Sequence, residues 1–383
     1  MPKVLISAGE ASGEMYGAAL LDALKRISPS PVEAFGLGGE RMHAAGCEII
    51  VHSKDVAVVG IAEVATHLPR IYREFHKLLR EADRRQPDVA VLIDFPDFHF
   101  RLAKALHARG IPIVYYVSPQ LWAWRRGRIK LVQRYVKKML VIFPFEEQFY
   151  RDHGVAAEFT GHPLAELTVG AEPRAEFAGQ YGLDPAKAWV GILPGSRRKE
   201  VQMILPTLLE AAKILGSGYE YLLPVASTLE EDWLRSQLQR IPATPRITLT
   251  NDARQTLVQC RAAMVASGTA TVEAAVLGTP FVMVYRVSPL SWKLGRRLVK
   301  LSHFAMPNVI AEREIVRELV QGNFTATNVV AEVKALMEIG ARREQVKRDL
   351  AEVRSHLQAG RATESAAERA AKAVLGAIES KSN

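Results

Sequence analysis

The stretch Trp189–Val201, WVGILPGSRRKEV, joins an apolar run to a Pro-Gly turn and then to a charged segment that can begin a helix. Apolar character without polar alternation is typical of a strand in a parallel sheet covered on both faces. The same order of strand, small-residue turn and helix recurs at Ser7–Glu14, SAGEASGE, and at Ala266–Glu273, ASGTATVE. The repetition predicts an α/β fold in which βαβ units build doubly wound parallel sheets.

Further apolar runs extend this pattern over most of the chain. The expected strands are KVLISAG, DVAVLIDF, IPIVYYVS, KKMLVIF, WVGILPG, YEYLLPV, RAAMVAS and TPFVMVYRV. Residues 161–177 mix glycine, proline and charge, which predicts an interdomain connection. We therefore expect two Rossmann-like domains, residues 1–168 and 169–345. C-terminal helices over 346–383 are expected to pack back toward the first domain.

The bulk composition limits the classes of function. An apolar content of 48% and a charged content of 24% are ordinary for a globular protein of 383 residues. The net charge of +9 favours an anionic partner: nucleic acid, a phosphorylated substrate or an acidic membrane surface. Cys47 and Cys260 are far apart and lack metal-ligand spacing, so a reducing compartment is expected. No apolar run approaches the roughly 18 residues of a spanning helix, and no signal peptide is recognised.

In the first half, carboxylates follow two expected strands. Glu10 lies in the turn after the first strand, where small residues let a ligand approach the backbone. Asp94 and Asp97 follow the run VLI, and either could accept a proton from an attacking hydroxyl. The alternatives are a plain strand-to-helix turn and an aspartate that caps the next helix. The spacing Asp-x-x-Asp is not that of a metal-nucleotide site, so no metal is expected.

In the second half, two turns are suited to binding a diphosphate. Ser196 and Arg197 precede an expected helix, and a helix N-terminus with an arginine fork favours anionic oxygens. The turn after RAAMVA offers further backbone N–H groups, and a glutamate one helical turn later could bind a ribose diol. Its candidate residues are Ser267, Gly268, Thr269, Ala270 and Glu273. The alternative for the arginine and the glutamate is ordinary helix stabilisation.

Two segments have the composition of a membrane-docking surface. One is VSPQLWAWRRGR, with Trp122, Trp124, Arg125, Arg126 and Arg128. Tryptophan favours the membrane interface, and each basic residue near an anionic leaflet adds about 1 kcal/mol. The other is the apolar helical stripe that includes Ile61, Leu68 and Ile71. The alternative is a buried tryptophan in the first segment and core packing in the second.

Taken together, these motifs resemble the lipid-A-disaccharide synthases. The resemblance runs in order through GEASGE, GLGGERM, VVGIAEV, DFPDF, YYVSPQLWAW, FPFE, GHP, LPGSRRKEV, ASGTATVE and MPNVIAERE. It implies a GT-B architecture, with two Rossmann-like domains that face a central cleft. It also implies a membrane-surface glycosyltransferase of Gram-negative bacteria, cytoplasmic and peripheral on the cytoplasmic face of the inner membrane.

The resemblance further implies a reaction and its site residues. A 2,3-diacylglucosamine unit passes with inversion from UDP to the 6-hydroxyl of 2,3-diacylglucosamine 1-phosphate, which yields the β-1,6 disaccharide 1-phosphate and UDP. By this likeness Asp97 is the general base, with Asp94 as the other possibility. Glu10, Arg197 and Asn308 are the other essential polar positions, and 267–273 is the UDP site. No metal and no cofactor are implied, and a homodimer is possible.

Other functions remain to be separated from this one. Another GT-B enzyme that uses a UDP-sugar, such as a UDP-N-acetylglucosamine epimerase or a soluble glycosyltransferase, would keep the nucleotide half without the tryptophan–arginine segment. A nucleic-acid-binding module is disfavoured because aromatic and basic residues do not alternate along a strand. An NAD-dependent oxidoreductase is disfavoured because the G-x-G-x-x-G pattern is missing.

Overall fold

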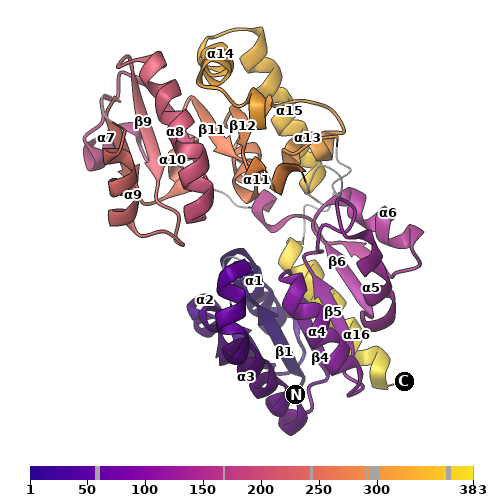
Figure 1. The fold of residues 1–383 in the computed structure, drawn as a ribbon. Helices are drawn as coiled ribbons and strands as arrows, with labels where there is room; N and C mark the ends of the chain where they lie inside the picture. Colours follow the sequence, from indigo (N-terminus) through magenta and orange to yellow (C-terminus); the bar gives the residue numbers. More distant parts are fainter. Residues whose placement is uncertain are drawn as a thin grey trace. The chain divides into compact units, whose positions relative to one another are not determined.

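The computed structural model describes residues 1–56, 61–166, 169–241, 245–289, 291–293, 302–358 and 364–382, with the backbone alone for 61–67 and 380–382. The chain forms two compact units (Figure 1). The first comprises residues 1–166 and 357–383, and the second comprises residues 167–356. Among the described residues, no helix has the length and apolar character needed to cross a membrane.

The first unit contains a seven-stranded parallel sheet in the order β3-β2-β1-β4-β5-β6-β7. Its strands are β1 (Lys3–Ala8), β2 (Glu33–Gly38), β3 (Glu48–His52), β4 (Val89–Ile93), β5 (Ile113–Tyr116), β6 (Lys138–Val141) and β7 (Ala157–Phe159). Its helices are α1 (Ala11–Ile27), α2 (Glu40–Ala44), α3 (Ile61–Arg85), α4 (Pro96–His107), α5 (Ile129–Tyr135), α6 (Pro144–Asp152) and α16 (Ala366–Ser382), with short 3-10 turns η1 (Ser53–Asp55), η2 (Arg126–Arg128) and η3 (Pro163–Glu166). The C-terminal helix α16 packs against α1, β4 and β5 (Figure 1).

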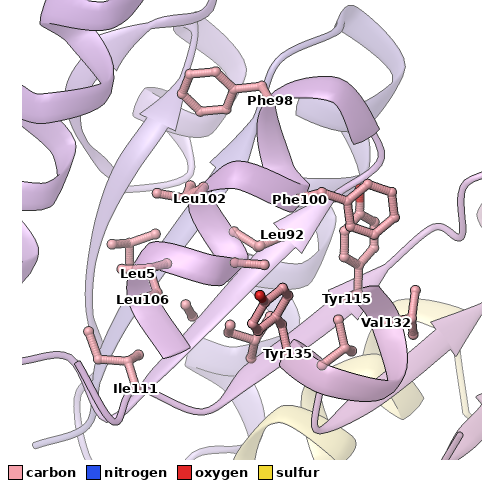
Figure 2. Packing of buried hydrophobic residues seen from close by; sticks show 14 of the residues in the cluster. Leu5, Leu92, Phe98, Phe100, Leu102, Leu106, Ile111, Tyr115, Val132 and Tyr135 are labelled. Carbon is pink, nitrogen blue, oxygen red and sulfur yellow. The ribbon is translucent and has the colours of Figure 1, made fainter. Parts of the chain in front are cut away.

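The core of the first unit explains why its central strands are apolar at nearly every position. Leu5 of β1 and Leu92 of β4 are fully buried, and Leu102 and Leu106 of α4 pack in the same cluster (Figure 2). Because helices cover both faces of the sheet, inward and outward side chains alike are removed from water. Burial of each such leucine contributes about 1.5–3 kcal/mol relative to exposure.

The second unit contains a six-stranded parallel sheet in the order β10-β9-β8-β11-β12-β13. Its strands are β8 (Ala188–Leu193), β9 (Tyr219–Pro224), β10 (Ile247–Thr250), β11 (Ala262–Ala266), β12 (Phe281–Tyr285) and β13 (Glu318–Val320). Its helices are α7 (Arg174–Tyr181), α8 (Arg198–Leu215), α9 (Glu231–Gln239), α10 (Ala253–Gln259), α11 (Thr269–Val276), α13 (Met306–Ala311), α14 (Ala326–Met337) and α15 (Ala341–Leu357), with the 3-10 turn η4 (Gln321–Asn323).

The prediction of two parallel α/β sheets is confirmed, and each expected strand is present. The division into domains at residues 168 and 345 stays a prediction. By its packing, most of α15 belongs to the second unit, and the chain returns to the first unit at Leu357.

The strands that the apolar pattern missed are β2, β3, β7, β10 and β13, and all of them except β2 lie at the edges of their sheets. Strand β2 was missed because glycines interrupt its apolar run. A Cβ on Gly36 would lie 2.0 Å from the Ile6 carbonyl oxygen, so only glycine lets these backbones approach.

Candidate functional site

The strand order of each sheet changes direction at one place. In the first unit this place lies between β1 and β4, and in the second it lies between β8 and β11. Ligands of open α/β sheets bind beyond the carboxyl ends of the strands at such a switch point. The turns that follow these four strands carry Glu10, Asp97, Arg197 and Ser267. The candidate residues of each half therefore gather at the switch point of their own sheet.

The turn after β4 is held in an unusual backbone conformation. Asp94 and Phe95 both have φ of +49°, in the left-handed region that non-glycine residues seldom adopt. The Asp94 carbonyl accepts a hydrogen bond from the Tyr115 hydroxyl at 2.6 Å and lies 2.6 Å from His99 Nδ1. These buried contacts offset the strain and place Asp97 in the exposed first turn of α4.

The carboxylate of Asp97 is paired with two arginines from the loop after β5. Its Oδ1 lies 3.0 Å from Arg125 Nη1 and is also bonded by Arg128 Nη2. Burial acts to raise the pKa of Asp97, but Arg128 and Arg125 outweigh it, so the pKa lies below its usual value. Arg125 also stacks 4.3 Å from the Trp124 ring, whereas Arg126 donates to a backbone carbonyl four residues earlier. The loop thus presents two cations beside an ionised carboxylate.

The two tryptophans of this loop have different environments. Trp122 is buried, and its indole N–H donates to Glu146 Oε1 at 3.0 Å while its ring meets Phe145 edge-on. Trp122 is therefore the buried tryptophan that the alternative expected in this segment, and its part in an acceptor or membrane surface stays a prediction. Trp124 is 38% exposed and remains a surface candidate. Burial raises the pKa of Glu146 to about 8, despite hydrogen bonds from Trp122 and the Phe143 backbone.

The apolar stripe on α3 also divides into buried and exposed positions. Leu68 is 48% exposed and Tyr72 is 67% exposed, one helical turn apart. Ile71 is partly buried and packs against the core cluster, so its assignment to a lipid-facing surface stays a prediction. The side chain of Ile61 lies outside the described residues.

The turn after β1 presents its carboxylate to solvent. Glu10 is the N-cap residue of α1, but its side chain does not cap the helix. Gly9 precedes it, and a Cβ on Gly9 would lie 2.3 Å from the Phe95 ring, so the two switch-point turns pack against each other. Glu10 is exposed and lies on the turn that contacts the turn leading to Asp97.

In the second unit, the turn after β8 leads directly into the N-terminus of α8. Gly195 has φ of +115°, and a Cβ there would lie 2.7 Å from Glu200 Oε2. Glu200 reaches back to accept a hydrogen bond from the Ser196 N–H and pairs with Arg197 at 3.1 Å. Arg197 is exposed, so this ion pair is weak and an anionic ligand could replace it. Arg198 instead pairs with a glutamate from the segment before α9.

The turn after β11 leads directly into the N-terminus of α11. Gly268 is the N-cap with φ of +142°, a conformation that favours glycine. The N–H groups of Thr269 and Ala270 lie in the first turn, where an α-helix has no internal acceptors. Glu273 is largely buried and accepts a hydrogen bond from Arg254 Nε at 3.1 Å. The arrangement suits an anion at the helix N-terminus, with a carboxylate one turn away.

Asn308 is fully buried and uses all of its amide inside the unit. Its oxygen accepts from two N–H groups of residues 315–316, and its nitrogen donates to the Val316 carbonyl and to Glu318. Glu318 also accepts from the Phe304 N–H, and the Phe304 carbonyl accepts from the Ser267 hydroxyl at 3.1 Å. Asn308 is therefore linked to the Ser267 turn through Glu318 and Phe304. An amide side chain has two N–H groups, and both are used here, so Asn308 leaves no N–H for a ligand.

Several site residues were missed from the sequence. They are the partners that hold the candidates in place: Glu146, Glu200, Arg254 and Glu318. Glu200 and Glu146 follow a recognisable local pattern, because each is a glutamate in the first turn of a helix. In the described part of the chain, no group of three or more His, Cys, Asp or Glu side chains could hold a metal ion.

Comparison with known proteins then identifies the family. The model of the lipid-A-disaccharide synthetase family matches residues 4–374. The chain belongs to this family. The lipid-A-disaccharide synthase of Koribacter versatilis is 80% identical over 381 residues and all of both chains. That of Acidobacterium capsulatum is 56% identical over 337 residues, which cover 85% of this chain and 84% of the relative. The synthetase family is a family of glycosyltransferases.

Solved structures similar to the chain share its GT-B fold at low sequence identity. CalG4, the calicheamicin glycosyltransferase, is 18% identical with a TM-score of 0.60, and the match covers 99% of this chain and 98% of that one. A complex of S. aureus MnaA with UDP is 13% identical with a TM-score of 0.67, and the match covers 100% of this chain and 97% of that one. Two parallel α/β units of this kind are thus common to both proteins and this chain.

Proposed function

We propose that the chain transfers 2,3-diacylglucosamine from UDP to the 6-hydroxyl of 2,3-diacylglucosamine 1-phosphate and forms a β-1,6 linkage with inversion. The observation that carries the proposal is membership of the synthetase family over nearly the whole chain. The placement of the candidate residues supports it. Carboxylates lie at the switch point of the first unit, and anion-binding turns lie at that of the second.

In this proposal the second unit binds the UDP donor. Arg197 and the N-termini of α8 and α11 interact with the diphosphate, because guanidinium groups and unpaired helix N–H groups both stabilise negative charge. They act most strongly as the leaving UDP gains charge in the transition state. Glu273 accepts hydrogen bonds from the ribose hydroxyls in exchange for its bond to Arg254.

The first unit binds the acceptor. Asp97 accepts the proton of the 6-hydroxyl as that oxygen attacks the anomeric carbon of the donor, and the bond from this carbon to the UDP oxygen breaks. Arg125 and Arg128 keep Asp97 ionised and bind the acceptor phosphate. Glu10 lies on the adjacent turn, where its carboxylate orients the sugar hydroxyls.

We further propose that the first unit works at a membrane surface. Removal of each acyl methylene from a bilayer costs about 0.8 kcal/mol, so extraction of a chain of about ten carbons costs roughly 8 kcal/mol. Exposed Trp124 with Arg125 and Arg126, and exposed Leu68 on α3, are the residues that would contact lipid. This role places the chain at the cytoplasmic face of the inner membrane.

Vesicle binding tests the membrane proposal. The variant Leu68→Ser should bind anionic vesicles less strongly than the natural chain and leave the thermal unfolding midpoint within a few degrees of the natural value. The matched control is Ile214→Ser, at a half-exposed isoleucine of the second unit. Equal vesicle binding by the natural chain and Leu68→Ser would refute the role of Leu68.

Incubation of the purified chain with both acylated substrates, in detergent and EDTA, tests the reaction. Disaccharide phosphate and UDP should form in equal amounts. Asp97→Asn should lower kcat by about 10²–10⁴-fold, the range for loss of a general base. Asp94→Asn is the matched control, because asparagine tolerates the left-handed backbone at that position. Turnover of UDP-N-acetylglucosamine without acyl chains would instead favour the epimerase or soluble transferase.

A further inference from the structure

A second cationic site lies in the second unit, at the opposite edge of the sheet from the donor turns. It is a pocket of about 410 Å³ beside the amino ends of β8 and β11. Four of its lining residues carry positive charge: Arg174, Lys187, Arg261 and Arg343. Strand β8 has six residues and rises about 3.3 Å per residue, so the pocket lies roughly 17 Å from the turn after β8. The donor diphosphate of the proposed reaction does not reach this far.

The arginines of this pocket are bonded to neutral groups. Arg174 stacks on Trp189 at 3.7 Å from the ring centre and donates to three backbone carbonyls, those of Pro185, Lys187 and Gln259. Arg343 donates to the carbonyls of residues 261 and 336. Carbonyl acceptors fix a guanidinium in place but do not neutralise it. The positive charge is therefore held rigidly and remains available to an anion.

Arg261 provides an independent sign of a missing partner. Its Nε is buried and has no hydrogen-bond partner among the described residues, although a buried N–H is normally satisfied. Burial lowers the pKa of Arg174, and burial together with the charge of Arg261 lowers the pKa of Arg343. The one carboxylate paired with this group in the described structure is Glu220, 3.6 Å from Lys187. Positive charge at this place is thus incompletely compensated.

We propose that this pocket binds a phosphate group, with Arg261 and Lys187 as the contacting side chains. A phosphate carries about 1.5 to 2 negative charges and several acceptor oxygens, which match the excess of cations that line the pocket. Arg174 and Arg343, which are held in place by backbone carbonyls, supply a positive electrostatic potential around the phosphate. The chemistry fits free phosphate and a lipid phosphomonoester head group equally well, so the experiment separates these sources.

Titration calorimetry of the full chain with inorganic phosphate, against sodium chloride at equal ionic strength, measures the site. The natural chain should bind one phosphate saturably, and Arg261→Met should weaken binding at least tenfold. This variant removes only the unpartnered group and keeps the apolar stem, so the fold should survive. The matched control is Lys213→Gln, at an exposed cation on α8. It should bind phosphate like the natural chain.

Vesicles that contain phosphatidic acid, compared with phosphatidylglycerol vesicles, test the lipid source. Binding that prefers phosphatidic acid and falls in Arg261→Met assigns the pocket to a lipid head group. Arg261-dependent binding of inorganic phosphate alone assigns it to a soluble anion. If neither probe distinguishes Arg261→Met from the natural chain, or if Lys213→Gln weakens binding equally, the proposal is overturned.

Discussion

Glu146 offers a direct test of how the loop with Arg125 and Arg128 is held. Its carboxyl is buried and accepts hydrogen bonds from the Trp122 indole at 3.0 Å and the Phe143 backbone at 3.2 Å. Glutamine has nearly the same shape and keeps an oxygen acceptor, but it carries no charge at any pH. The variant Glu146→Gln therefore isolates the free-energy cost of ionising this carboxyl inside the fold.

The size of the effect follows from the pKa of Glu146. Burial raises it from 4.5 to about 8, so the folded chain retains a proton that the unfolded chain releases in this interval. The stabilisation is fully present below pH 4.5 and is lost as the pH rises through about 8. One pKa unit corresponds to about 1.4 kcal/mol, so the loss approaches roughly 5 kcal/mol at high pH and roughly 3 kcal/mol at neutral pH.

Urea unfolding followed by tryptophan fluorescence, repeated from about pH 5 to about pH 9, measures this cost. The unfolding free energy of Glu146→Gln minus that of the natural chain should rise by about 1.4 kcal/mol per pH unit and level off above about pH 8. Glu147→Gln, on the same helix but partly exposed, should show no such slope. A difference independent of pH, or one that falls with pH, would show that Glu146 is ionised in the folded chain and refute the reasoning.

Two further predictions concern the candidate site. Arg128 lowers the pKa of Asp97, so the variant Arg128→Met should raise that pKa. The acid limb of the pH profile of kcat/KM should then move to higher pH. An acid limb that does not move would exclude Asp97 as the titrating base. Glu318→Gln should destabilise the second unit by about 1–3 kcal/mol, because the carboxylate accepts several buried N–H bonds. It should also raise the KM for the UDP donor, whereas Glu314→Gln, at a surface ion pair, should change neither thermal unfolding nor KM.

The strands that could be predicted all have a neighbour on both sides: β1, β4, β5 and β6 in the first sheet, and β8, β9, β11 and β12 in the second. Their residues are buried on both faces of the sheet, so nearly every position is apolar and the strands can be recognised as continuous apolar runs. The edge strands β3, β7, β10 and β13 have a neighbour on one side only and are partly exposed, so their composition does not differ from that of loops. Strand β2 has neighbours on both sides and was missed because glycines interrupt its apolar run. Strand β13, with three residues, is too short to produce any pattern.

The candidate residues at the switch points, such as Glu10, Arg197 and Ser267, were predictable because each lies between an apolar run and a helix. Their partners were not. Trp122 and Glu146 are 24 residues apart, and Ser267 reaches Asn308 only through Phe304 and Glu318. Burial of an indole or an amide depends on which side chains the fold brings beside it, and these neighbours cannot be predicted from the local sequence.

Local chemistry along the chain was therefore enough to specify the parallel sheets, the turns at the ends of their inner strands and the family. Tertiary packing alone decided that Trp122 is buried, that Asn308 has no free donor, and that cations from four separate segments meet at one pocket. The physical reason is the distance along the sequence over which each effect acts. Backbone propensity and apolar periodicity act over a few neighbouring residues, whereas hydrogen bonds and charges also join residues far apart in the chain, such as Arg174 and Gln259.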